Sequence, residues 1–202
     1  MTAARRYGIS RGRFIAGTAG AAGVIAVGAI GGAQLLSGKG GSSLQSDDPL
    51  ALALALERLQ AAFYGEAVAG GALSGELLEF ATTARDHEAK HASDLEPLAG
   101  SGAGGPVTYD FGNAVTDPDA FGTTSATLED LAVSAYNGMI PLLSKHGVEV
   151  TGRIVSVDAR HAAWIRAIGG LDPAENATDT ALTPEQVVAR VEDLGFITEP
   201  SP

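Results

Sequence analysis

The pattern of apolar and polar positions predicts four long helices in the chain. Apolar side chains recur at helical spacing over residues 49–69, 74–98, 125–145 and 148–168. Leu and Ala alternate at the start of the first run, as in a strand. The run continues at helical spacing through Phe63 without a β-branched residue, which favours a helix.

Capping residues and glycines set the expected limits of these helices. Asp48 is typical of an N-cap and is followed by a proline, while a glycine pair separates the first two helices. Residues 99–125 have no helical period and are rich in glycine, which predicts a long crossover between the second and third helices. Pro141 predicts a kink in the third helix. Thr183 predicts the cap of a short C-terminal helix that ends at Gly195.

Together these elements predict an all-α protein: a four-helix bundle whose helices are joined in two pairs by one long crossover. Composition agrees, because apolar residues make up 45% of the 202 residues and aromatic residues only 5%, so Ala and Leu must build the core. The sequence contains no Cys, which excludes disulfides, thiolate zinc sites and iron–sulfur clusters.

Charge is distributed unevenly along the chain. Residues 1–33 contain four Arg and no acidic residue, whereas residues 34–202 contain 9 Lys and Arg against 24 Asp and Glu, a net charge of −15. A body this acidic repels phosphate backbones, which excludes nucleic acid as a partner. It suits solubility or the attraction of metal cations.

Residues 1–33 are predicted to be an export signal or a membrane anchor, because a basic segment precedes the weakly apolar residues 14–36. Residues 10–15 are similar to a twin-arginine signal, with Gly12 where the second Arg is expected. Cleavage after Ala33 would give an exported protein of the periplasm or cell envelope. A membrane tether through residues 14–36 is the alternative, since about 20 apolar residues span a bilayer.

The four predicted helices contain an internal repeat. In each half, a glutamate in the first helix is followed in the second helix by a carboxylate-x-x-His segment, 31 residues later in the first half and 29 in the second. The repeated residues are Glu57, Glu88 and His91 in the first half, and Glu129, Asp158 and His161 in the second. A single Glu-x-x-His is common on solvated helix faces, but two ordered copies favour a shared site.

This repeat points to a site for two divalent metal ions. Residues three apart lie on one helix face, so each carboxylate and its His can point at the same ion. Glu57 and Glu129 lie on apolar stripes, where a carboxylate is costly unless it is paired or metal-bound. Four carboxylates and two imidazoles favour iron or manganese over zinc, and this donor set is the one found in di-iron and di-manganese bundles.

For several neighbouring residues the sequence predicts a role less specifically. Tyr64 and Tyr136 each follow their glutamate by two turns, either to hydrogen-bond a ligand carboxylate or to pack in the core. His87 is expected at the surface or edge, because it points about 100° away from the residue that follows it. His146 is expected at the end of the third helix, where it would complement the helix dipole. Trp164 is expected to pack in the core.

Taken together, these motifs resemble a known family. Residues 48–170 are similar to exported bacterial ferritin-like domain proteins, which are related to ferritin, rubrerythrin and manganese catalase. The segments that carry the resemblance are LERLQAAFY (56–64), EAKH (88–91), LEDLAVSAY (128–136) and DARHAAW (158–164). The resemblance implies a ferritin-like bundle with a carboxylate-bridged pair of metal ions, and it carries the six repeated residues over as ligands. Iron is expected in preference to manganese. The family has glutamate where this chain has Asp158, so the second ion is expected to bind more weakly.

The resemblance defines the site better than the reaction. The leading hypothesis is an oxidoreductase whose di-iron or di-manganese pair reacts with oxygen or peroxide in ferroxidase, peroxidase or catalase fashion. A non-catalytic metal-binding or stress-protection protein of the envelope is the alternative, and both a monomer and a homodimer stay open. The expected organisation is an export signal or anchor at 1–33, a linker at 34–47, the bundle at 48–170, and a tail with a short helix at 171–202.

Overall fold

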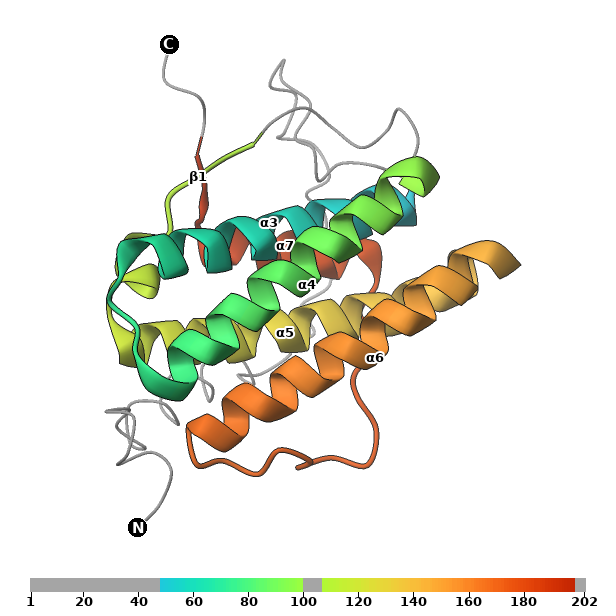
Figure 1. Ribbon diagram of the computed structural model, residues 1–202. Coiled ribbons are helices and arrows are strands. Elements are labelled where there is room, and N and C mark those ends of the chain that lie inside the picture. Colours follow the sequence, from blue (N-terminus) through green and yellow to red (C-terminus); the bar gives the residue numbers. More distant parts are fainter. Residues whose placement is uncertain (1–47, 100–106, 199–202) are drawn as a thin grey trace, which may run out of the picture.

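The computed structural model describes residues 48–99 and 107–198. These residues form the predicted all-α bundle, drawn in Figure 1, and the prediction of its fold class is confirmed. No helix of this part of the chain is long and apolar enough to cross a membrane. The export signal or anchor predicted at residues 1–33 lies outside the described residues.

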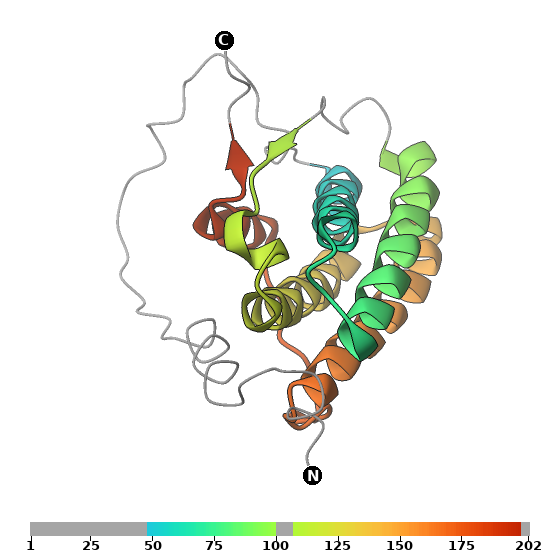
Figure 2. The same ribbon diagram turned by 60° about the vertical axis from the view of Figure 1, so that its left-hand side comes forward.

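Four long helices make two antiparallel pairs. The first pair is α3 (Pro49–Gly70) and α4 (Gly75–Ala99), and the second is α5 (Pro118–Met139) and α6 (Lys145–Ile168). The pairs pack on each other through α4 against α6 and α3 against α5. The short helix α7 (Pro184–Leu194) packs on α5, and Figures 1 and 2 show it on the side of α3 and α5 that faces away from α4 and α6.

Local signals explain most of the helix ends. Asp48 caps α3 by accepting a hydrogen bond from the backbone N–H of Leu50 at 2.9 Å, and Gly71 ends this helix with φ of 68°. Thr183 and Gln186 form a complete capping box at the start of α7, and Gly195 ends α7 with φ of 68°, as predicted.

The third helix differs from its prediction at both ends. It begins at Pro118 rather than near residue 125, because Asp117 caps it and accepts hydrogen bonds from two backbone N–H groups at 2.9 and 3.0 Å. It ends at Met139 rather than continuing through a kink to residue 145. The proline at 141 cannot continue an α-helix, so the chain makes a 3-10 turn over Ile140–Leu142.

The early end of α5 makes the expectation for His146 wrong. Ser144 starts α6 by accepting a hydrogen bond from the backbone N–H of Gly147 at 3.1 Å. His146 therefore lies in the first turn of α6, at the positive rather than the negative end of a helix dipole. Its Nδ1 atom is 3.8 Å from the Oε2 atom of Glu149.

The crossover joins the C-terminal segment in an interaction that the sequence analysis did not predict. Strand β1 (Thr108–Tyr109) pairs antiparallel with β2 (Ile197–Thr198), and a 3-10 helix, Gly112–Val115, leads on to α5. The rings of Phe111 and Phe196 pack edge to face with centroids 5.2 Å apart. This contact fixes the C-terminal segment against the crossover.

Candidate metal centre

All six residues of the internal repeat meet in the interior of the bundle. The four carboxylate residues have no exposed surface, and the exposed fractions of His91 and His161 are 7% and 3%. Their possible ligand atoms form two overlapping groups, in each of which one atom per residue lies within 4.8 Å of the others. The groups are Glu57, Glu88 and His91, and Glu88, Glu129, Asp158 and His161.

Glu88 on α4 lies between the two histidines. Its Oε2 atom is 2.9 Å from Nδ1 of His91, and its Oε1 atom is 2.9 Å from Nδ1 of His161. The repeat places Glu88 in the first half of the site, and packing of α4 on α6 brings its carboxylate close to the histidines of both halves. One carboxylate therefore faces two imidazoles.

The remaining carboxylates surround this central group. Glu57 on α3 places Oε2 3.3 Å from Nδ1 of His91, and Glu129 on α5 places Oε2 3.5 Å from Nδ1 of His161. Asp158 belongs to the group that contains His161, yet its Oδ1 atom is also 3.5 Å from Nδ1 of His91. Each half therefore has one glutamate and one imidazole of its own, and two carboxylates lie within reach of both.

Several buried atoms of this cluster have no hydrogen-bond partner among the described residues. Both Asp158 oxygens lack one, as do Oε2 of Glu57 and Oε2 of Glu129. Nδ1 of His161 and Oε1 of Glu88 are close enough for an ion pair but are not aligned for a hydrogen bond. Buried oxygens without partners cost free energy. A cation among them would remove this cost, so the donor set fits divalent metal ions.

The two tyrosines hold the outer glutamates in a crossed arrangement. Tyr64 on α3 donates a hydrogen bond of 2.5 Å to Oε1 of Glu129 on α5, and Tyr136 on α5 donates one to Oε1 of Glu57 on α3. The sequence left open whether these side chains bind carboxylates or pack in the core, and they do both, since each is fully buried. Each bond satisfies one glutamate oxygen and leaves Oε2 beside the imidazole.

Burial and mutual repulsion perturb the ionisation of the carboxylates. Burial, together with the charge of Glu88, raises the pKa of Glu57 well above its usual range and raises the pKa of Glu129 to about 7. Burial and the charges of Glu57 and Glu88 likewise raise the pKa of Asp158 well above its usual range. In the metal-free protein these three carboxyl groups therefore hold protons more tightly than in water.

At the centre of the cluster the pKa values shift in the opposite direction, toward the charged forms. Burial would raise the pKa of Glu88, but the close contacts of its carboxylate with His161 and His91 outweigh burial and lower it. Burial would lower the pKa of both histidines, but the glutamate oxygens close to each imidazole raise it, to about 9 for His91 and about 10 for His161. In the metal-free protein these shifts favour the ionised form of Glu88 and the protonated forms of the two histidines.

His87 was predicted to lie at the surface or edge, and its side chain is indeed exposed. Its Nδ1 atom, however, lies 2.9 Å from Nε2 of His161, and the two rings are nearly parallel, with centroids 5.2 Å apart and an interplanar angle of 16°. His87 lies outside the internal repeat, so no role in the site was predicted for it. The signal that could have found it is its position four residues before His91, one turn along the same helix face.

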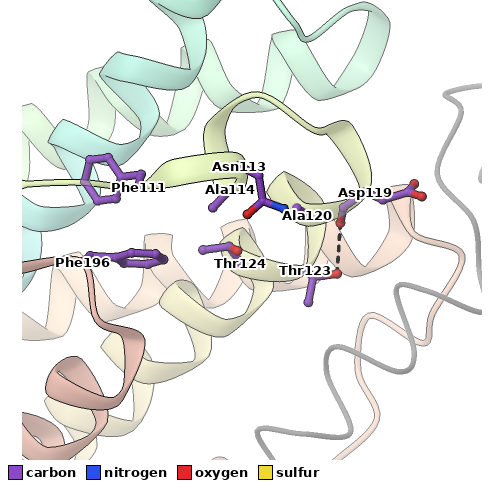
Figure 3. Close-up of a pocket in the computed structure, with 8 residues that line it drawn as sticks. All are labelled: Phe111, Asn113, Ala114, Asp119, Ala120, Thr123, Thr124 and Phe196. Carbon is purple, nitrogen blue, oxygen red and sulfur yellow. Dashed lines mark hydrogen bonds between the residues drawn. The ribbon is translucent and has the colours of Figure 1, made fainter.

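The pocket in Figure 3 lies apart from this cluster. It has a volume of about 320 Å³ and lies where the crossover and the C-terminal segment meet the first turns of α5. None of the cluster residues lines it. The eight lining residues are Phe111, Asn113, Ala114, Asp119, Ala120, Thr123, Thr124 and Phe196.

Comparison with known proteins agrees with this architecture. The sequence profile described as the ferritin-like domain matches residues 46–170, which is more than half of the chain and includes every residue of the cluster. No curated protein matches the sequence.

Proposed function

We propose that this chain, which belongs to the ferritin-like domain family, holds two divalent metal ions in its buried cluster and uses them in redox chemistry with oxygen or peroxide. The observation that carries the proposal is the position of Glu88, whose two oxygens face Nδ1 of His91 and Nδ1 of His161. Charge supports a pair of ions, because four ionised carboxylates balance two divalent cations when both imidazoles are neutral.

The two halves of the cluster assign the ligands. Glu57 and His91 would hold one ion, Glu129 and His161 the other, and Glu88 and Asp158 are within reach of both. This oxygen-rich set with one imidazole nitrogen per ion suits iron and manganese, and we propose iron as the preferred metal. A bound pair of such ions supplies the electrons for reactions of oxygen or peroxide.

The chain's own residues orient and enclose this chemistry. Tyr64 and Tyr136 hold Oε1 of the two outer glutamates, so that Oε2 of each stays directed at its imidazole. Phe80 packs edge to face on His161 with ring centroids 6.3 Å apart. The apolar wall around the cluster limits the access of water, which strengthens the electrostatic interactions inside it.

The reaction is tested by loading the metal-free protein with Fe(II) under anaerobic conditions and adding oxygen or hydrogen peroxide. We expect Fe(II) oxidation and consumption of the oxidant, and a fall of at least about tenfold in rate for Glu57→Gln, since an amide cannot replace a charged ligand. Glu149→Gln changes an exposed glutamate of α6 and should react like the parent protein. A protein that binds iron but oxidises it no faster than free Fe(II) would contradict the catalytic proposal and support the non-catalytic, metal-binding alternative.

We also propose that the protein is exported to the periplasm or cell envelope by the twin-arginine route. The support is the basic and then apolar sequence of residues 1–33, together with a buried site that is best filled before export of a folded domain. Replacing Arg11 and Arg13 by Lys should block export. Replacing Arg5 and Arg6 by Lys in a separate variant shows which arginine pair the export machinery recognises. Export that survives both double substitutions, or that continues without the twin-arginine machinery, would overturn this route.

A further inference from the structure

We propose that His87 is a positioning residue for the metal centre: it accepts a hydrogen bond from Nε2 of His161 and so holds Nδ1 of His161 toward the metal ions. This role deepens the proposed function and rests on it. His87 lies outside the internal repeat, so the repeat does not account for it.

The contacts of His161 fix its ring from both sides. Nδ1 faces the carboxylates, 2.9 Å from Oε1 of Glu88 and 3.5 Å from Oε2 of Glu129. Nε2 faces the other way and lies 2.9 Å from Nδ1 of His87. The two rings are nearly parallel, with an interplanar angle of 16°, which suits an in-plane hydrogen bond between these nitrogens.

The chemistry of a metal-bound imidazole requires such a partner. Nδ1 of His161 can bind a metal ion only without a proton, so the neutral ring carries its proton on Nε2. Nδ1 of His87 is placed to accept this proton in a hydrogen bond, which leaves the His87 proton on its own Nε2. A hydrogen bond of this kind fixes both the tautomer and the ring orientation of a histidine ligand.

The two halves of the site differ at this position. Glu88 corresponds to Asp158 in the repeat, so the residue that corresponds to His87 is Val157. A valine side chain cannot accept a hydrogen bond, so it cannot orient His91 in the way that His87 orients His161. Loss of the His87 ring should therefore weaken binding of the ion beside His161 and leave the affinity for the ion beside His91 nearly unchanged.

The test is a calorimetric titration of the metal-free full chain with Co(II), which should show two binding steps in the parent protein. We expect His87→Leu to weaken one step by about 10- to 100-fold. His87→Asn should stay within about threefold of the parent, because its amide oxygen is as many bonds from the backbone as Nδ1 of histidine and also accepts a hydrogen bond. His146→Leu changes another exposed histidine and is the matched control.

A second readout separates positioning from a general loss of packing. In protein labelled with ¹⁵N-histidine and loaded with diamagnetic Zn(II), the Nε2 proton of His161 should give a hydrogen-bonded signal in the parent and in His87→Asn, but not in His87→Leu. Two unchanged Co(II) steps in His87→Leu, or two steps weakened equally, would overturn the role of His87 alone. A parent protein that binds no Co(II) would overturn the metal centre itself, and the role of His87 with it.

Discussion

Replacing Glu88 by alanine should abolish tight binding of both metal ions, whereas replacing Glu57 should weaken the binding of only one ion. Glu88 is the carboxylate whose two oxygens face the two imidazoles, so its removal takes a ligand from each ion at once. Glu57 belongs only to the group that contains His91. We expect the affinity for each ion to fall by at least about 100-fold in Glu88→Ala, the upper part of the range for disrupted metal sites. The measurement is bound Mn(II) per chain after gel filtration.

Two further variants keep this result interpretable. Glu79→Ala removes an exposed glutamate from the same helix and should bind metal like the parent protein. Glu88→Gln keeps the volume of the side chain while removing its charge, so it separates loss of a ligand from a cavity in the core. If Glu88→Ala lost one ion and bound the other with parental affinity, Glu88 would belong to one half of the site only, as the repeat by itself suggested.

The metal-free protein should lose stability as the pH rises from 6 to 9. The pKa values of His91 and His161 are raised to about 9 and about 10 in the folded state, so between pH 6.5 and these values the folded chain binds more protons than the unfolded chain. The free energy of unfolding therefore falls as pH rises through this window. Glu129 adds to the fall below its pKa of about 7, and the raised pKa of Asp158 acts in the same direction.

The expected loss is on the order of a few kcal/mol, which is a large part of the stability of a domain this size. Glu88 has a lowered pKa, so its contribution is lost only in acid and does not oppose the trend. Bound metal should reverse the trend, because the ligands must lose their protons to bind and rising pH helps them to do so. Melting temperatures at pH 6 and pH 9, with EDTA or with Mn(II), measure both effects. Equal melting temperatures at the two pH values in EDTA would contradict the buried, proton-holding cluster.

The sequence predicted best what repeats or local signals encode. Two copies of a glutamate followed by a carboxylate-x-x-His segment pointed to all six residues that the bundle gathers. The caps at Asp48 and Thr183 are local in the same sense. At Asp117 the same Asp-Pro signal starts a helix. The glycine and threonines that follow it show no helical spacing of apolar residues, so the first two turns of α5 were not predicted.

Contacts between distant segments could not be predicted from the sequence. The hydrogen bond from Tyr64 goes to Glu129 of the other half rather than to the glutamate two turns before it, since the packing of α3 on α5 decides the partner. Strands β1 and β2 are two residues each, and they pair although most of the helical domain lies between them in the sequence. No contact was predicted for His87, because its position on α4 does not show that the packing of α6 brings His161 next to it.

The most direct test of the central claim is a crystal structure of the protein grown with Mn(II), with anomalous scattering recorded to locate the ions. We expect two anomalous peaks inside the bundle, one beside Glu57 and His91 and one beside Glu129 and His161, with the Glu88 carboxylate between them. A single peak, or a folded protein with no peak among these residues, would contradict this claim.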